Sequence, residues 1–116
     1  HYTCYLLPDT RLPMIYIADA IRAILELMQA PADKITVRSA YNLNGLTLSP
    51  RDLEMEIRKR YPDFRCSYQP DFRQRLAESW PESIDDTAAR RDWGWKPHYD
   101  LPRLCEVMFE AIAQKP

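Results

Sequence analysis

The sequence predicts an α/β fold, formed as a single domain by residues 1–116. Short segments rich in β-favouring residues alternate with segments of helical periodicity, and turn residues separate them. A length of 116 residues and a hydrophobic fraction of 46% suffice for one buried core. We therefore expect strands and helices to succeed one another along most of the chain.

The strands are predicted from composition and alternation. The first stops at the turn signal Pro8-Asp9 and the third at Asn44-Gly45. In the third, apolar and polar side chains alternate, which indicates one buried face. The predicted strands cover residues 2–6, 14–17, 35–42 and 65–69.

Two longer helices are predicted in the first two thirds of the chain. In residues 18–30 apolar side chains recur at the i, i+3, i+4, i+7 spacing, and this stripe is expected to face the core. Before residues 50–61, Ser49 is a typical N-cap, followed by proline at the first position and by Asp52 three residues later. The stripe of the first helix is Ile21, Ile24, Leu25 and Met28, and that of the second is Leu53, Ile57 and Tyr61.

The remainder is predicted to hold shorter helices and a last long one. Residues 72–80 form a short helix or an ordered loop, and residues 87–93 form a helix that Gly94 ends in the left-handed conformation. Asp100 caps the last helix, and Trp93-Gly94-Trp95 is expected to pack against it. The apolar face of that helix is Leu101, Leu104, Cys105, Met108, Phe109 and Ile112.

Composition argues against several classes of partner. The chain has 16 Lys+Arg against 17 Asp+Glu, interspersed, for a net charge of -1. A nucleic-acid or anionic-membrane binder usually gathers a basic excess in one stretch. No run of about 18 apolar residues is present to span a membrane. We expect neither nucleic acid nor membrane as a partner.

Glycines, cysteines and histidines restrict the possible cofactor and metal sites. Only Gly45 and Gly94 are present, whereas a dinucleotide fingerprint needs three closely spaced glycines and a P-loop needs two beside a lysine. The three cysteines are too far apart for a zinc site or a disulfide framework, so we expect reduced thiols and a reducing compartment. No catalytic, cofactor-binding or metal-binding residue is expected within the chain.

Arg73-Gln74-Arg75 is the most informative polar cluster. An arginine can hold a carboxylate or phosphate through a bidentate fork, so two arginines around a glutamine can line a pocket. In the alternative interpretation, the arginines pair with nearby acids such as Asp71 or Glu78. Asp85-Asp86 and the pair Glu78 with Glu82 are interpreted as a helix cap and as solvent-facing acids rather than as catalytic carboxylates.

Motifs distributed over the whole chain carry a resemblance to a known family. The most specific is Pro70-Asp71-Phe72-Arg73-Gln74 followed by Ser79-Trp80-Pro81, and further ones are Ala18-Asp19-Ala20, Tyr41-Asn42-Leu43 and Asp92-Trp93-Gly94-Trp95. With these motifs the chain resembles the C-terminal third of extended short-chain dehydrogenases/reductases, the epimerase/dehydratase superfamily. Ser-Trp-Pro and Trp-Gly-Trp resemble its short-chain L-threonine 3-dehydrogenase branch.

The resemblance implies the substrate-binding lobe of an NAD-dependent, homodimeric oxidoreductase that converts threonine to 2-amino-3-ketobutyrate. It places the last strand of the Rossmann sheet in this chain. The Rossmann core, with NAD and the catalytic Tyr-x-x-x-Lys, would belong to a missing N-terminal domain, since no tyrosine here has lysine at that spacing. The chain would then be inactive by itself, with the missing domain and a small amino-acid substrate as its partners.

The same resemblance implies a site and a compartment. A lid that excludes water before hydride transfer is expected to bind the substrate. The compartment is expected to be the cytoplasm, or the mitochondrial matrix in a eukaryote. The residues assigned to substrate binding are Arg73, Gln74, Trp80, Pro13 and Met14.

Two other interpretations stay open. A nucleotide-sugar epimerase or dehydratase lobe would use Arg73 and Arg75 to hold a diphosphate. A free-standing, non-catalytic domain would bind a partner or a small molecule. In that case residues 35–42 would need a strand partner from elsewhere, such as a second copy of the chain.

Overall fold

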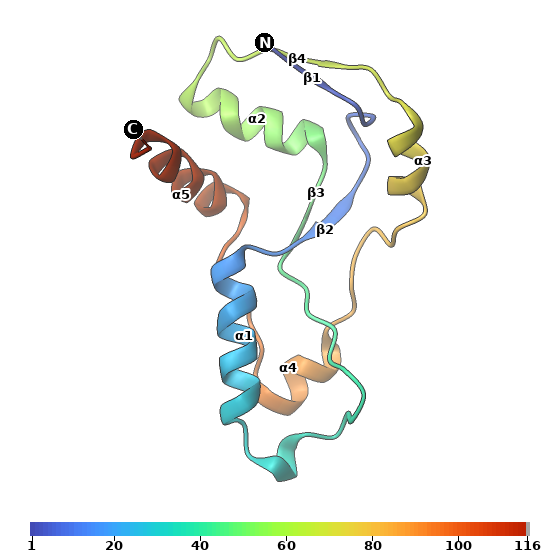
Figure 1. Cartoon of the computed structure of the whole chain (residues 1–116), viewed down its shortest axis with the longest axis vertical. Helices are drawn as coiled ribbons and strands as arrows, with labels where there is room; N and C mark the ends of the chain where they lie inside the picture. Colours follow the sequence, from blue (N-terminus) through green and yellow to red (C-terminus); the bar gives the residue numbers. More distant parts are fainter. Residues whose placement is uncertain (116) are drawn as a thin grey trace.

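The computed structural model describes residues 1–115 and is elongated, with extents of 52 × 35 × 22 Å (Figure 1). Its radius of gyration is 16.9 Å, against about 13 Å for a compact domain of roughly this length. The elements are β1 (Tyr2–Cys4), β2 (Leu12–Met14), α1 (Ile17–Gln29), a 3₁₀ turn (Ala32–Lys34), β3 (Leu46–Leu48), α2 (Pro50–Arg60), β4 (Cys66–Tyr68), α3 (Phe72–Glu78), α4 (Thr87–Trp93) and α5 (Leu101–Ala113).

Two separate clusters of buried side chains divide the molecule. The upper region in Figure 1 holds β1, β4, α2 and α3, and its core is Leu6, Leu12 and Ala77. The lower region holds α1, α4 and the irregular segment 35–45, and its core is Ala23, Ala89 and Trp95. The antiparallel pair β2–β3 lies between them. The α/β fold class is confirmed, although the described residues form only two small sheets.

The sheets confirm two of the predicted strands. β1 pairs in parallel with β4, with Tyr2 opposite Cys66 and Cys4 opposite Tyr68. The strand expected at residues 14–17 is wrong in position, because β2 ends at Met14 and Ile17 already begins α1. Its register is set by β3, a strand that the sequence analysis did not predict.

Helix ends predicted from local chemistry are confirmed. Ser49 and Asp52 form a capping box on α2, in which each side chain accepts a hydrogen bond from the other's backbone N–H, at 3.2 and 2.9 Å. Asp100 Oδ1 accepts from Arg103 N at 3.0 Å and caps α5. Gly94 ends α4 with φ of 69°. The stretch 72–80 contains the short helix α3.

The expectation that the apolar stripe of α1 faces the core is wrong. Those side chains are exposed by 52 to 77%, and the buried face of α1 carries Asp19 and Ala23 instead. Periodicity identifies an apolar face of a helix but not the element that covers it. Within residues 1–115, no element covers this face of α1. The outward residues are Ile21, Ile24, Leu25 and Met28, together with Ile17.

The strand expected at residues 35–42 is also absent. After the 3₁₀ turn the chain is irregular up to Gly45, because no strand lies beside it within the described residues. Side chains of the α4 region hold it instead: Asp92 Oδ2 accepts from the hydroxyls of Thr36 at 2.6 Å and Tyr41 at 2.8 Å. The indole of Trp95 donates to Asn44 O at 3.1 Å. The segment is thus held by side-chain hydrogen bonds on one side, and no strand among residues 1–115 pairs with its other side.

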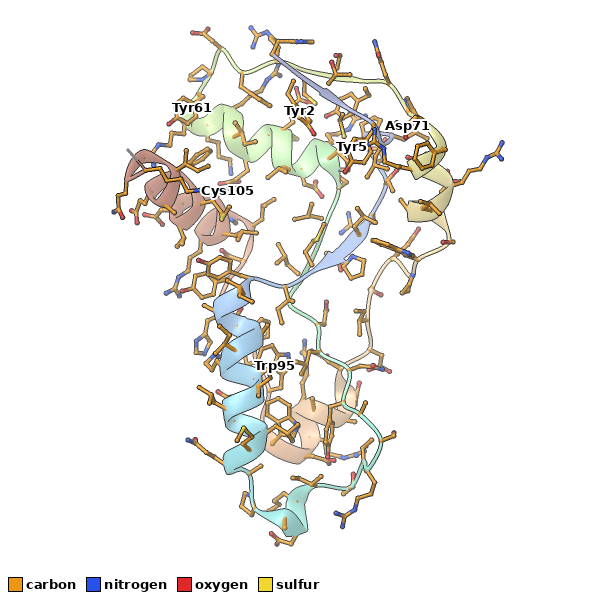
Figure 2. All side chains as sticks on the ribbon, in the orientation of Figure 1. Tyr2, Tyr5, Tyr61, Asp71, Trp95 and Cys105 are labelled. Carbon is orange, nitrogen blue, oxygen red and sulfur yellow. The ribbon has the colours of Figure 1, made fainter. Side chains whose placement is uncertain are left out.

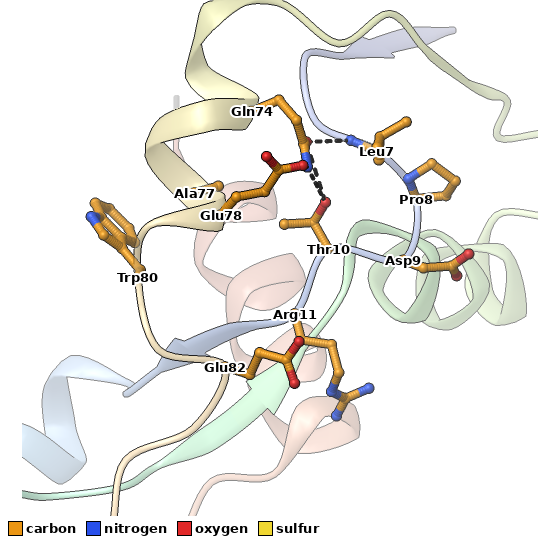
Figure 3. Close-up of a pocket in the computed structure, with 10 residues that line it drawn as sticks. All are labelled: Leu7, Pro8, Asp9, Thr10, Arg11, Gln74, Ala77, Glu78, Trp80 and Glu82. Carbon is orange, nitrogen blue, oxygen red and sulfur yellow. Dashed lines mark hydrogen bonds between the residues drawn. The ribbon is translucent and has the colours of Figure 1, made fainter.

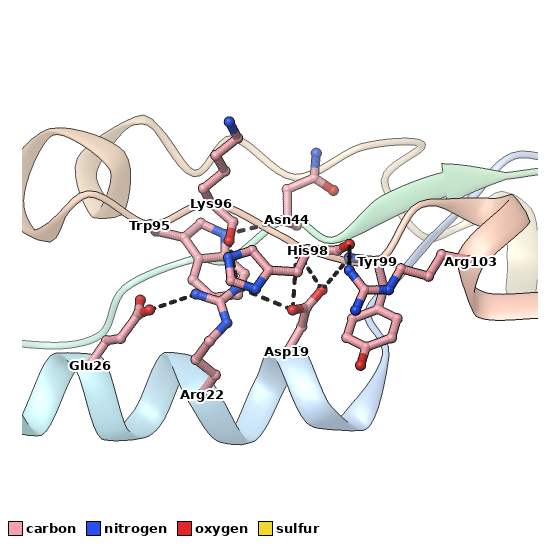
Figure 4. A network of polar contacts seen from close by, with 9 residues as sticks. All are labelled: Asp19, Arg22, Glu26, Asn44, Trp95, Lys96, His98, Tyr99 and Arg103. Carbon is pink, nitrogen blue, oxygen red and sulfur yellow. Dashed lines mark hydrogen bonds and ion pairs between the residues drawn. The ribbon is translucent and has the colours of Figure 1, made fainter. Parts of the chain in front are cut away.

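We had expected Trp95 to pack against the last helix, but it packs against α1 and α4 instead. Beside it, the fully buried carboxylate of Asp19 accepts hydrogen bonds from the backbone N–H groups of His98 and Tyr99, at 3.1 and 3.0 Å (Figure 4). Arg22 donates to the same carboxylate at 3.1 Å and lies over the Trp95 ring. These contacts fix the segment that leads from α4 to α5.

The last helix packs on α2, and Tyr61 and Cys105 lie at this contact (Figure 2). The rings of Tyr61 and Phe109 meet edge to face with their centroids 5.2 Å apart, and Cys105 is buried. The predicted apolar face of α5 is confirmed only in part, because Met108 and Ile112 are exposed. The inner stripe predicted for α2 is likewise incomplete, since Leu53 and Tyr61 are exposed by 37 and 51%. Among the helices of residues 1–115, none combines the length and the apolar character needed to cross a membrane.

Candidate functional site

Two hollows meet at Trp80, next to α3. The first, about 420 Å³, lies between α3 and the loop before β2 (Figure 3). The second, about 340 Å³, lies between α3, strand β2 and the two residues Tyr5 and Leu6 that follow β1. Trp80 and Ala77 line both, and the Trp80 side chain is 60% exposed. We call the two hollows together the Trp80 site.

Arg73 lies on the wall of the second hollow and is already paired. Its guanidinium contacts both carboxylate oxygens of Asp71, at 2.6 to 3.1 Å, and stacks on the Tyr5 ring at 3.4 Å from the centroid. This hydrogen bonding raises the pKa of Arg73 and lowers that of Asp71 from their ordinary values. Pairing with a nearby acid, one of the two interpretations from the sequence, is therefore found for Arg73. Its side chain remains 44% exposed, so one edge is open to a ligand.

Gln74 has a different position, in the wall of the first hollow, where it is buried. Its Oε1 accepts from the backbone N–H of Leu7 at 2.8 Å, and its Nε2 donates to Glu78 at 2.9 Å and to the Thr10 hydroxyl at 3.0 Å. Figure 3 shows the bonds to Leu7 and Thr10, which connect α3 to the loop before β2. The amide is occupied, so its evident structural task is to hold this loop.

Met14 and Pro13 come from β2. Met14 pairs with Leu46, is 43% exposed and lines the second hollow. Pro13 lies opposite Thr47 and lines neither hollow. Of the five residues predicted to bind substrate, the fold thus brings Arg73, Met14 and Trp80 around one hollow and places Gln74 beside it.

The first hollow is predominantly acidic, which the sequence analysis did not anticipate. Asp9, Glu78 and Glu82 face one cation, Arg11. Asp9 is paired with Arg51 at 2.9 Å, and Arg11 lies 3.8 Å from Asp52. Glu78 and Glu82 had been interpreted as solvent-facing, and both are exposed, so that interpretation is confirmed. Only their closeness to Trp80 in the sequence could have indicated that they belong to this wall.

The two glycines test whether the chain can hold a dinucleotide. A Cβ at Gly45 would lie 2.6 Å from Met14 O and 2.8 Å from Ile15 Cα, so glycine here permits close packing of two chain segments. Gly94 serves the end of α4. Neither glycine forms a phosphate cradle, and the residues described do not fit NAD. Residues 1–115 also contain no group of three or more side chains placed to bind a metal ion.

Comparisons with known proteins identify relatives over nearly the whole chain. An uncharacterized epimerase/dehydratase of Staphylococcus haemolyticus is 44% identical over 115 residues, which are 98% of this chain and 36% of that protein. The mitochondrial L-threonine 3-dehydrogenase of Sus scrofa is 47% identical over 108 residues, 92% of this chain and 29% of that protein. The chain therefore spans about a third of the length of these relatives. No protein-family model matches it.

Solved structures agree with the sequence relatives. A GalE-like L-threonine dehydrogenase from Cupriavidus necator superposes with a TM-score of 0.91 and 48% identity, over 96% of this chain and 40% of that one. The L-threonine dehydrogenase of Phytophthora infestans gives 0.94 and 42%, over 99% of this chain and 37% of that one. The fold of nearly the whole chain, including the surroundings of Trp80, is thus shared with larger proteins.

Proposed function

Because the chain corresponds to the C-terminal part of L-threonine 3-dehydrogenases and epimerase/dehydratase proteins, we propose that it is the substrate-binding lobe of an NAD-dependent, threonine-oxidising enzyme. The proposal treats residues 1–116 as one lobe that is inactive by itself. One observation carries it: Arg73, Met14 and Trp80, predicted separately from sequence motifs, line the same hollow.

The chemistry of the Trp80 site suits a small zwitterion. The open edge of the Arg73 guanidinium can accept a carboxylate, while Asp71 fixes its orientation. The acidic wall of Glu78 and Glu82 in the adjoining hollow suits an ammonium group. The Trp80 indole between the two hollows would cover the ligand and exclude water before its hydroxyl is oxidised.

NAD would be bound outside this chain, by the part of a longer protein that relatives possess and residues 1–115 do not supply. A cytoplasmic location, or the mitochondrial matrix in a eukaryotic host, fits relatives that include a mitochondrial enzyme. Dimer formation remains a prediction from the resemblance.

The exposed stripe of α1 is our candidate for the contact with that N-terminal part. Ile17, Ile21 and Ile24 turn more than half of their surface to solvent, although each would favour burial. The irregular segment 35–45 lies next to α4 in the same region and has no strand partner among residues 1–115. A domain that covers α1 and pairs with this segment would supply both missing partners, as the resemblance to a last Rossmann strand implies.

An epimerase or dehydratase acting on a nucleotide sugar is the second candidate, since one relative is described as an uncharacterized epimerase/dehydratase. Such a substrate needs cations for its diphosphate. Arg73 is engaged by Asp71, and Arg75 lines neither hollow. The Trp80 site therefore favours the smaller, amino-acid substrate.

Steady-state kinetics of a longer protein containing this lobe test the proposal. Trp80→Ala should raise the KM for threonine about tenfold, equivalent to about 1.4 kcal/mol, and leave the KM for NAD within about twofold. Phe72→Ala is the matched control, because Phe72 is an exposed aromatic residue of α3 that lines neither hollow. Equal changes in both KM values, or no threonine-dependent NAD reduction by the wild type, would contradict the proposal.

A further inference from the structure

A third hollow, about 330 Å³, lies between the β1–β4 pair and α2, away from the Trp80 site. α2 runs alongside these two strands in the upper region (Figure 1). Leu53 and Ile57 of α2, with Phe64 and Tyr2, give it apolar walls. Cys4 and Cys66 also line it, and both are half-buried free thiols.

The sheet register places the two thiols on one face. Tyr2 pairs with Cys66 and Cys4 pairs with Tyr68, and in a strand only every second side chain points to the same side. Cys4 and Cys66 are diagonal neighbours, with Cα atoms about 8 Å apart for ordinary strand spacing. That separation exceeds the usual reach of a disulfide, so the hollow contains two separate nucleophiles.

The hollow offers no unengaged charge. Its one acid, Glu54, accepts a hydrogen bond from the Tyr68 hydroxyl and lies 3.6 Å from Arg58. Burial and the hydrogen bond to Glu54 raise the pKa of Tyr68, so this phenol stays neutral. A ligand that enters must therefore be small, mainly apolar and uncharged.

We propose that this hollow is a modification site for small uncharged carbon electrophiles, such as α,β-unsaturated carbonyl compounds, which Cys4 and Cys66 capture as thioethers. The thiol first releases its proton to water, and the thiolate sulfur then bonds to the β-carbon of the acceptor. The electron pair of the C=C bond forms an enolate, which takes a proton from water at the α-carbon. The net step adds S–H across the double bond and requires no oxidant. This site does not depend on the proposed function.

Cys105 provides an internal comparison. It is buried and lines a different hollow, between α2 and α5, among the charged side chains of Glu56, Lys59 and Arg60. Burial raises the pKa of its thiol, which lowers the thiolate fraction. An apolar reagent should have no advantage over a charged one at this position.

The test compares two reagents with the same reactive group on the 116-residue chain. N-phenylmaleimide is apolar, whereas 3-maleimidopropionate carries a carboxylate; peptide mass mapping gives the labelling rate of each cysteine. Relative to the ratio on free glutathione, we expect the phenyl reagent to be favoured at least tenfold at Cys4 and Cys66, and not at Cys105. A ratio at Cys4 and Cys66 equal to that of glutathione would overturn the proposal.

A pair of variants localises the effect to the hollow. Leu53→Glu places a carboxylate in its wall and should abolish the preference, whereas Met55→Glu adds the same charge at an exposed position of α2 outside it. Thermal unfolding checks that both variants fold. If Leu53→Glu unfolds, the reagent ratio of the wild type still decides. An unchanged preference in a folded Leu53→Glu variant would contradict the site.

Discussion

The upper and lower regions of the molecule use buried polar groups in different ways. In the lower region three carboxylates are buried, and each accepts a backbone N–H from a segment without regular structure: Asp19 from His98 and Tyr99, Asp86 from Asn44, and Asp92 from Thr36. In the upper region the buried polar groups, Ser49 and Gln74, cap a helix and hold a loop beside open hollows. In the lower region, buried carboxylates thus hold the irregular segments in place, while the apolar face of α1 is exposed to solvent.

This difference indicates a division of labour. Carboxylates that satisfy irregular backbone can hold a surface in place before its partner arrives, since they replace hydrogen bonds that a sheet would otherwise supply. Under the proposed function, the hollows of the upper region must stay open to ligands. We therefore expect core substitutions in the lower region to affect stability most, and substitutions at Trp80 to affect substrate binding.

The largest expected loss of stability follows Asp19→Ala. It leaves the backbone N–H groups of His98 and Tyr99 and the Arg22 guanidinium without their acceptor, which should lower the free energy of unfolding by about 2–5 kcal/mol. Asp100→Ala is the control, because Asp100 also accepts a backbone N–H but is exposed, and the loss of such a cap costs about 1 kcal/mol. Denaturant unfolding measures both. Equal losses would refute the importance assigned to the buried acid.

The junction of the two regions should be next in sensitivity. Gly45→Ala brings a methyl group within 2.6 Å of the Met14 carbonyl oxygen and should cost about 1–3 kcal/mol, because backbone atoms must move. At Gly94 a methyl group meets nothing within 4 Å, and only the positive φ is strained, so Gly94→Ala should cost about 1 kcal/mol. Thermal unfolding of the two alanine variants separates steric overlap from backbone strain. A smaller loss at Gly45 than at Gly94 would contradict the close packing.

Features that depend on residues close together in the sequence were predicted correctly, and features that depend on distant partners were not. The Ser49–Asp52 box, the Asp100 cap and Gly94 were predicted because their partners lie within a few residues. The burial of the α1 stripe and the strand at residues 35–42 were also predicted, and both predictions were wrong, because within residues 1–115 no element covers the stripe and no strand pairs with the segment. An apolar period reports a preference for burial, and something else must satisfy it.

The candidate site shows the same limit. Sequence motifs suggested Arg73, Gln74 and Trp80, but not that the Gln74 amide is used by Leu7 and Thr10, more than sixty positions away. Met14 reaches the hollow because β3 fixes the register of β2, and β3 itself was missed. Residue types indicated the chemistry, whereas long-range pairing decides which groups are free to bind.

A pH-dependent effect is expected from Asp92. Hydrogen bonds from Arg91, Thr36 and Tyr41 lower the pKa of this carboxyl well below its ordinary value. Its contribution to stability is therefore fully present above about pH 4–5 and is lost as the pH falls further, because the unfolded chain takes up the proton first. Asp92→Asn should lower the melting temperature at pH 7, and the difference from the wild type should shrink at pH 3. A difference that is constant with pH would show that Asp92 acts only through its shape.

The smallest change in the stability of the 116-residue chain is expected from a substitution on the exposed face of α1. This substitution also tests most directly whether that face is a contact surface. Ile24 is 59% exposed, so Ile24→Lys should change the unfolding free energy of the 116-residue chain by less than about 0.5 kcal/mol. In a longer protein that carries the N-terminal part, the same lysine would be buried without a partner and should lower the melting temperature markedly, whereas Gln29→Lys on the same helix should not. A large loss in the short chain would mean that α1 is covered within this chain or by a second copy of it, and no loss in the longer protein would mean that the N-terminal part contacts another surface. The exposed stripe of α1 therefore serves as a contact surface only if its substitution lowers the stability of the longer protein more than that of the 116-residue chain.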